Sequence, residues 1–147
     1  MTRCRFNRCA AALAALAVAS LSAGVGPALA QPVSVPLDQT ATINGVDVGC
    51  TGIGQTKNDP KWLAYPVRLE FADPKHDYLA NERVKLMSPS GAPVLDVACE
   101  GPWLLMKLPA GRPYKVTADV PGAPPQTQIV RAPAHGQQRF VITFAVD

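Results

Sequence analysis

Apolar and polar residues alternate with a period of two along several short segments of this chain. Residues 114–120 (YKVTADV) show the pattern most clearly, because Tyr114, Val116, Ala118 and Val120 all fall on one face. Such alternation is typical of a β-strand with one face in the core and the other in water. Five further segments are predicted as strands, on this pattern or on a more fully apolar one: residues 65–71, 82–87, 94–99, 103–108 and 139–146.

Turn-forming residues separate these segments. Asn44-Gly45 lies between β-branched residues in segment 40–48, and this pair predicts a tight hairpin. Residues 103–108 (WLLMKL) are apolar on both faces, which predicts an interior strand. Residues 109–111 (PAG) then predict a turn that joins this strand, as a second hairpin, to the strand that begins near Tyr114.

The stretch between the first hairpin and residue 65 is the least regular. Its motif GCTGIG (residues 49–54) differs from the dinucleotide-binding fingerprint and opens no βαβ unit, so it predicts a sharp loop. One short helical turn is compatible with residues 59–62, since Asp59 can cap it and Pro60 fits the first helical position.

These patterns together predict an all-β domain. Seven to nine strands with short connections favour antiparallel neighbours, and that number of strands indicates a single antiparallel β-sandwich. No internal repeat or long linker indicates a second domain, so the predicted sandwich covers residues 31–147. A chain of this length is enough for one hydrophobic core.

The first 30 residues have the pattern of a secretory signal peptide. Arg3, Arg5 and Arg8 precede an apolar run at residues 10–21, and the segment ends in Ala28-Leu29-Ala30, a small-x-small cleavage site. The apolar run is shorter than the roughly 20 residues that a membrane span needs. We therefore expect cleavage before Gln31, export to the periplasm or the medium, and no membrane span in the mature protein.

Charge and cysteine content refine this prediction. The leader holds three of the 14 basic residues, which leaves 11 basic against 11 acidic residues, so nucleic acid is not an expected partner. The leader also removes two of the four cysteines. Cys50 and Cys99 remain, and we expect them to form a disulfide in an oxidising compartment. A reactive redox pair is disfavoured because the chain has no Cys-x-x-Cys motif.

Residues 101–118 carry a recognisable motif. Leu108-Pro109-Ala110-Gly111, followed by Tyr114, Val116 and Ala118, is similar to the Leu-Pro-x-Gly-x-Tyr-x-Val-x-Ala segment of carboxypeptidase-regulatory-like domains, which are transthyretin-like (prealbumin-like) sandwiches. Pro113 lengthens the spacing by one residue and predicts a wider turn. More broadly, residues 45–146 resemble small uncharacterised periplasmic proteins of Gram-negative bacteria. The resemblance implies a sandwich fold and a non-catalytic role.

Two histidines are the main candidates for metal or catalytic chemistry. His76 lies in a polar turn and His135 in the segment APAHG. Their spacing from each other and from the two cysteines matches no zinc module, so they are expected as loop residues. A copper site that combines either histidine with Met87 or Met106 is the chemical alternative, although Met106 is expected to fill core space.

Aromatic residues are the candidates for ligand binding. Trp62, Tyr65 and Tyr78, together with Trp103, are of the type that stacks on a glycan or a peptide. Trp103 lies in the doubly apolar segment and is expected to be buried, whereas Trp62, beside Lys61 in the irregular loop, is the candidate for exposure.

No common catalytic motif is present, since the chain has neither Gly-x-Ser-x-Gly nor His-Glu-x-x-His. We therefore predict a non-catalytic, monomeric binding or structural module of the cell envelope, without a cofactor, whose partner is an envelope protein or a glycan. One alternative is a periplasmic copper-binding protein or small hydrolase that uses His76 and His135. Another is a scaffold whose open sheet edge pairs with a partner strand.

Overall fold

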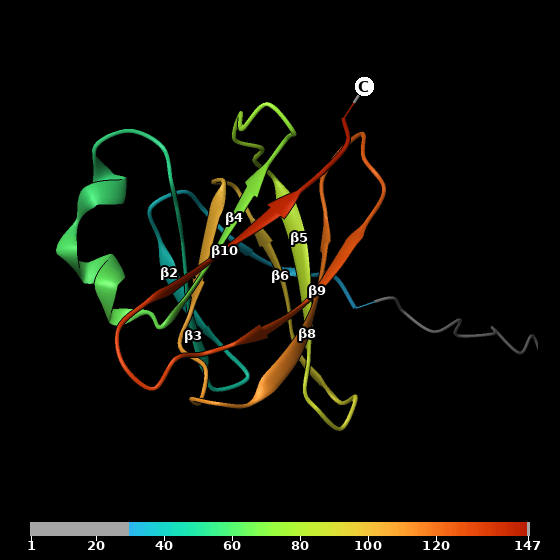
Figure 1. The fold of residues 1–147 in the computed structure, drawn as a ribbon. Coiled ribbons are helices and arrows are strands. Elements are labelled where there is room, and N and C mark those ends of the chain that lie inside the picture. Colours follow the sequence, from blue (N-terminus) through green and yellow to red (C-terminus); the bar gives the residue numbers. More distant parts are fainter. Residues whose placement is uncertain (1–29, 147) are drawn as a thin grey trace, which may run out of the picture.

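A computed structural model describes residues 30–146 of the protein, so the predicted leader lies almost wholly outside the described residues. Residues 30–146 form an all-β sandwich of two five-stranded sheets (Figure 1), which confirms the predicted fold class. The first sheet has the order β1-β6-β5-β8-β9 and the second β10-β4-β7-β3-β2. The strands are β1 Val33–Val35, β2 Thr40–Ile43, β3 Val46–Thr51, β4 Val67–Ala72, β5 Glu82–Met87, β6 Pro93–Cys99, β7 Trp103–Met106, β8 Pro113–Asp119, β9 Gln126–Arg131 and β10 Gln138–Thr143.

The segments with alternating residues form strands close to their predicted positions. β2 and β3 make the predicted hairpin, and both residues of its turn have positive φ angles, 49° at Asn44 and 80° at Gly45. A type I′ turn requires this conformation at both positions, and Asn-Gly tolerates it best. β7 is the predicted interior strand, because it pairs with β3 on one side and β4 on the other.

Two strands go beyond the eight that the pattern predicted, and both lie at a sheet edge. β1 has only three residues, and β9 buries Val130 alone of its six residues, so neither shows a clear alternation. Residues 30–146 therefore form ten strands instead of the predicted seven to nine. Two edge pairs, β1 with β6 and β10 with β4, are parallel, whereas the other pairs are antiparallel as predicted.

The predicted hairpin between residues 103–108 and the strand near Tyr114 is wrong. β7 lies at the centre of the second sheet, while β8 lies between β5 and β9 in the first. Both edges of β7 are already paired, with β3 and β4, so β8 has no free edge there to join. The Pro109–Gly111 turn, with φ 77° at Gly111, instead directs the chain across to the other sheet.

The core lies between the two sheets. Leu69, Phe71, Leu86, Leu104 and Phe144 are among its largest fully buried side chains. The predicted disulfide is confirmed: it joins Cys50 of β3 to Cys99 of β6, and so links the two sheets across the core. Met106 is fully buried, as predicted. No helix in residues 30–146 is long and apolar enough to cross a membrane.

One carboxylate, Glu82 at the start of β5, is buried on the core side of its strand. Its side chain is inaccessible to solvent, and neither carboxylate oxygen forms a hydrogen bond with another of the described residues. Burial raises the pKa of Glu82 well above its usual value, because the charged form loses its hydration. Folding therefore shifts the protonation equilibrium of this side chain toward the neutral form, relative to the unfolded chain.

A Glu82→Gln variant is expected to change how stability depends on pH. A raised folded-state pKa stabilises the wild-type fold below the ordinary glutamate pKa of about 4.3, and this stabilisation is lost as the pH rises through the folded-state pKa. The variant lacks this loss, so its advantage over wild type grows as the pH rises from the ordinary glutamate pKa of about 4.3 through the folded-state pKa. Urea unfolding at several pH values measures this difference in the free energy of unfolding. Glu100→Gln is the control, because the Glu100 side chain is exposed. If the stability of wild type and of Glu82→Gln changed in parallel with pH, the expectation would be contradicted.

Candidate functional site

The outer face of the β10-β4-β7-β3-β2 sheet carries a second, smaller apolar cluster of Trp62, Tyr65, Trp103 and Leu105. Trp103 and Leu105 project outward from β7, alternating with Leu104 and Met106, which pack in the main core. This second cover explains why the β7 sequence is apolar on both faces. The cover comes from two short 3₁₀ helices, η1 (Thr56–Asn58) and η2 (Pro60–Ala64).

Local sequence features hold η2 against the sheet. The Asp59 carboxylate caps it by accepting a 2.9 Å hydrogen bond from the Lys61 backbone N–H, and Pro60 takes the first position, as predicted. The Trp62 indole Nε1 donates to the Thr56 carbonyl at 2.8 Å. Gly49 on β3 leaves room for the ring, since a Cβ there would lie 2.7 Å from Cζ3 of Trp62.

Two of the three aromatics predicted as ligand-binding residues are buried instead. Trp62 is 3% exposed and Tyr65 is 7% exposed, so neither offers an open ring face. Lys61, which suggested exposure, places its ammonium 4.4 Å from the centre of the Trp62 ring and helps to cover it. The expected exposure of Trp62 is thus corrected, because η1 and η2 fold back onto the sheet. Tyr78 is 46% exposed.

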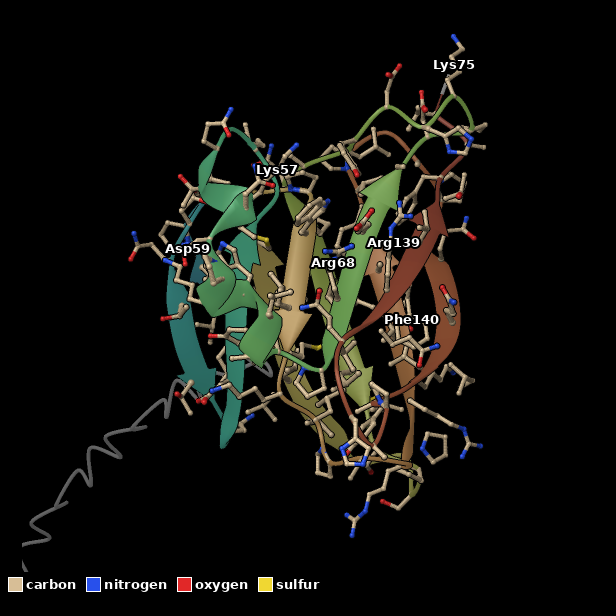
Figure 2. The ribbon with its side chains drawn as sticks, turned by 60° about the vertical axis from the view of Figure 1, so that its left-hand side comes forward. Lys57, Asp59, Arg68, Lys75, Arg139 and Phe140 are labelled. Atoms are coloured by element: carbon tan, nitrogen blue, oxygen red, sulfur yellow. A yellow bond between two sulfur atoms is a disulfide. The ribbon has the colours of Figure 1, made fainter. Side chains whose placement is uncertain are left out.

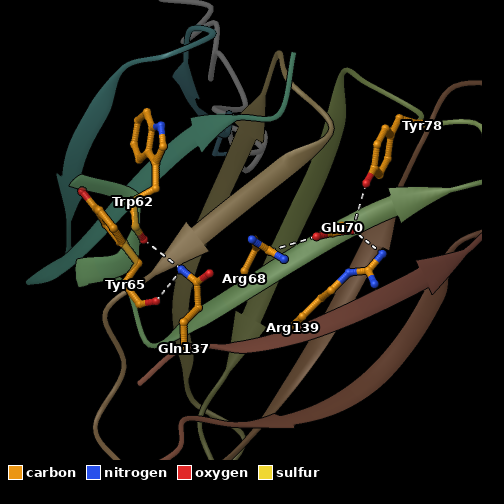
Figure 3. Close-up of polar contacts among 7 residues, drawn as sticks. All are labelled: Trp62, Tyr65, Arg68, Glu70, Tyr78, Gln137 and Arg139. Atoms are coloured by element: carbon orange, nitrogen blue, oxygen red, sulfur yellow. Dashed lines mark hydrogen bonds and ion pairs between the residues drawn. The ribbon is translucent and has the colours of Figure 1, made fainter. Parts of the chain in front are cut away.

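A buried carboxylate lies on the same outer face. The side chain of Glu70 on β4 is 1% exposed and contacts two arginines: Arg68 Nε lies 2.9 Å from Oε1, and Arg139 Nη2 lies 2.7 Å from Oε2. The Tyr78 hydroxyl donates to Oε2 at 3.3 Å (Figure 3). The hydrogen bond and charge of Glu70 raise the pKa of Arg139. The carboxylate therefore fixes three side chains from β4, β10 and the β4–β5 loop.

Strand register explains why Arg68 and Arg139 both reach Glu70. β10 pairs in parallel with β4, and Arg139 lies directly opposite Arg68, so both arginines reach the same face on either side of Glu70. Gln137, just before β10, ties the strand to the helical cover: its Nε2 donates to the carbonyls of Trp62 at 2.8 Å and Tyr65 at 2.9 Å. Figure 3 shows both sets of contacts side by side.

Trp103 connects the arginine network to the aromatic cluster. The Arg68 guanidinium lies 4.6 Å from the centre of the Trp103 ring, and the ring of Tyr78 meets it edge-on with 6.0 Å between centroids. The Lys57 ammonium is 5.8 Å from the same ring. We call the surface formed by Lys57, Arg68, Tyr78, Trp103 and Arg139 the aromatic–arginine face; Lys57, Arg68 and Arg139 mark it in Figure 2.

Two hollows open on this face. The first, of about 220 Å³, lies beside the 3₁₀ helices. It is lined by Lys57, Asn58, Asp59, Trp62, Leu63, Arg68, Trp103, Leu105 and Gln137. The second, of about 440 Å³, lies near the end of β4 and is lined by Ala72, His76, Tyr78, Arg139, Val141 and Thr143. The fold thus places two of the predicted aromatic residues at neighbouring hollows: Trp62 lines the first hollow, and Tyr78 lines the second.

The two histidines do not come together. His76 follows the end of β4, whereas His135 precedes β10, whose first residue pairs with the first residue of β4. The length of a six-residue strand, about 17 Å, separates the two loops. Both side chains are exposed, and residues 30–146 contain no cluster of three His, Cys, Asp or Glu residues suited to a metal ion.

Sequence patterns did not reveal the polar half of the site. Arg68, Glu70 and Arg139 fall on the outward positions of the two predicted strands 65–71 and 139–146, where charged residues are common. Their meeting depends on a parallel pairing between strands far apart in sequence. One weak signal was present: Val141 makes the outward face of segment 139–146 partly apolar, as expected for a face that is not fully open to water.

No protein-family model matches this chain, and no curated protein matches it. The resemblance of residues 101–118 to carboxypeptidase-regulatory-like domains stays a prediction. The sandwich that the resemblance implied is present, although sandwiches of this kind host many unrelated functions.

Proposed function

We propose that the protein is a non-catalytic binding module that acts outside the cytoplasm, in the periplasm or after secretion, and that the aromatic–arginine face is its binding surface. The Glu70 network is the observation that carries this proposal. Taking a carboxylate out of water is costly, and hydrophobic residues of similar size often stabilise a fold better. A network that holds two partly exposed arginines and a half-exposed tyrosine in place is suited instead to preorganised recognition.

The proposed location rests on two observations. The leader pattern of residues 1–30 predicts export. The Cys50–Cys99 disulfide is of the kind that persists in oxidising compartments. The placement of the histidines argues against the rival copper or hydrolase function that would use both of them, because His76 and His135 lie in loops at opposite ends of β4.

Native mass spectrometry of protein expressed with its own leader tests the location and the chemistry. We expect a mature form that starts at Gln31, is two hydrogens lighter than the reduced mass and is monomeric. A retained organic ligand would support the binding module. A bound metal ion, or turnover of a substrate by the purified protein, would contradict the non-catalytic assignment.

Site-specific photo-cross-linking in envelope extracts tests the binding surface. A photoreactive phenylalanine analogue replaces either Tyr78 on the proposed face or Ile129 on β9, an edge strand of the other sheet. The two side chains are similarly exposed, at 46% and 57%, which makes them a matched pair. Adducts at position 78 alone support the proposal. Adducts at position 129 alone would contradict it and favour a scaffold that pairs through its sheet edge.

A further inference from the structure

The edge strand β9 has one side without a strand partner. Among the strands of residues 30–146 it pairs with β8 alone, so the N–H and C=O groups of every second residue point away from the sheet. Proteins commonly protect such edges by shortening them, charging them or placing proline in them. The edge strands β1 and β2 have three and four residues, whereas β9 has six, with no proline and one charge, at its last residue. The free side of β9 can therefore accept a further strand.

An apolar hollow adjoins this edge on the outer face of the first sheet. Its volume is about 370 Å³, and its lining includes Met87, Pro89, Pro113 and Ile129. Ile129 belongs to β9 itself and is 57% exposed, so the edge and the hollow share this residue. Recognition by strand addition uses both features, because main-chain hydrogen bonds supply affinity and hollows for alternate side chains supply specificity.

The free charges around β9 are positive. Arg112, Lys115 and Arg131 are exposed, and none of them forms an ion pair with another described residue. Nη1 of Arg131 donates to a backbone carbonyl at 3.2 Å, which leaves its other N–H groups available. Residues 101–146 contain one acidic residue, Asp119, and it lies at the far end of β8 from Lys115. The surroundings of β9 therefore favour a partner with acidic side chains.

Strand register fixes the spacing of the side chains that such a partner needs. In the β8–β9 ladder Lys115 lies opposite Ile129 and Pro113 lies opposite Arg131, so these four side chains share the outer face. A strand added to β9 continues the two rows. Its residues opposite Ile129 and Arg131 are two positions apart and lie on the same face, whichever direction the added strand runs.

We propose that β9 binds an extended segment of a partner protein in which an apolar residue and an acidic residue are two positions apart. The backbone of the segment pairs with the free side of β9, its apolar side chain packs on Ile129 beside the hollow, and its acidic side chain pairs with Arg131. A second copy of this chain is disfavoured, because its own β9 brings the same cations to the edge. This surface lies on the other sheet from the aromatic–arginine face, so the inference goes beyond the proposed function.

An NMR titration of the isotope-labelled, disulfide-bonded protein tests strand addition. The probe is acetyl-Thr-Glu-Thr-Leu-Thr-Glu-Thr-amide, which offers the motif in both directions. We expect it to shift the backbone amide signals of β9 in a saturable manner. N-methylation of every second residue blocks one side of the peptide backbone, so one of the two methylated peptides should lose binding and the other should keep it. If both bind like the parent peptide, strand addition is overturned.

Charge variants test the role of Arg131. Arg131→Gln is expected to weaken binding of the peptide about threefold, as the loss of one exposed ion pair implies. Lys75→Gln, which removes an exposed cation from the β4–β5 loop, is the control and is expected to bind like wild type. A peptide with lysine in place of both glutamates should not shift the β9 signals. Equal binding by wild type and Arg131→Gln would overturn the assignment of Arg131 to the acidic residue.

Two further outcomes would overturn the inference without deciding the proposed function. Shifts of the β9 signals with protein concentration, in the absence of peptide, would assign the edge to a second copy. No shift with the glutamate peptide would remove β9 as a docking site. In the cross-linking experiment this peptide should prevent adducts at position 129 and leave those at position 78 unchanged, because Tyr78 lies on the aromatic–arginine face.

Discussion

Replacing both Cys50 and Cys99 with alanine is expected to lower the free energy of unfolding by about 4 kcal/mol. The bond closes a loop between residues 49 positions apart, and on the chain-entropy model such a loop restricts the unfolded chain by about that amount. The two sulfurs also connect β3 to β6, so their removal unlinks the two sheets. Because domains are stable by only about 5–15 kcal/mol, the loss is a large share of the total.

Urea unfolding followed by tryptophan fluorescence measures this effect. With a slope of about 2 kcal/mol per molar urea, the unfolding midpoint should fall by about 2 M. A reducing agent should lower the stability of the wild type by a similar amount and leave the double alanine variant unchanged. If the midpoint of the double variant matches that of the oxidised wild type, the disulfide does not stabilise the fold.

Removing both cations of the Glu70 network is the second large effect. Arg68→Met combined with Arg139→Met leaves the Glu70 carboxylate buried, with the Tyr78 hydroxyl as its one remaining partner among residues 30–146. Breaking a buried ion pair in this way costs about 3 kcal/mol or more, because the remaining charge is desolvated and uncompensated. Urea unfolding of the double variant at neutral pH measures this loss.

Two controls separate the buried charge from lost packing. Adding Glu70→Gln to the double variant should recover most of the stability, since it removes the uncompensated charge. Arg83→Met breaks the Arg83–Asp96 pair on the first sheet, whose side chains are partly exposed, and should cost much less. A double variant as stable as Arg83→Met, or a triple variant without recovery, would contradict the role assigned to Glu70.

Short-range patterns predicted the parts of the fold that depend on neighbouring residues. Asn44-Gly45 predicted the β2–β3 hairpin because few residue pairs accept two consecutive positive φ angles. Asp59 and Pro60 predicted the start of η2 for a similarly local reason, namely side-chain capping and a preset φ angle. The disulfide followed from the count of cysteines outside the leader.

The candidate site was predicted only in part. The sequence predicts Trp62, Tyr65 and Tyr78 as binding residues, and they do gather on one face with Trp103. The burial of Trp62 and Tyr65, however, depends on helices that fold back over the sheet. No sequence pattern singles out Arg68, Glu70 or Arg139. Their charges are ordinary for outward strand positions, and Glu70 becomes unusual only because the structure buries it.

By itself the sequence determined which residues share a face in the eight predicted strands, where the Asn44-Gly45 turn lies and which cysteines pair. Tertiary structure alone decided which strands far apart in the sequence are neighbours, and which strands share a sheet: β7 and β8 belong to different sheets, and Arg139 reaches Glu70 through the parallel pairing of β10 with β4. The physical reason is that a period of two records burial on one side of a strand and carries no information about the partner at its edge. The aromatic–arginine face is built from such edge pairings and from the helical cover.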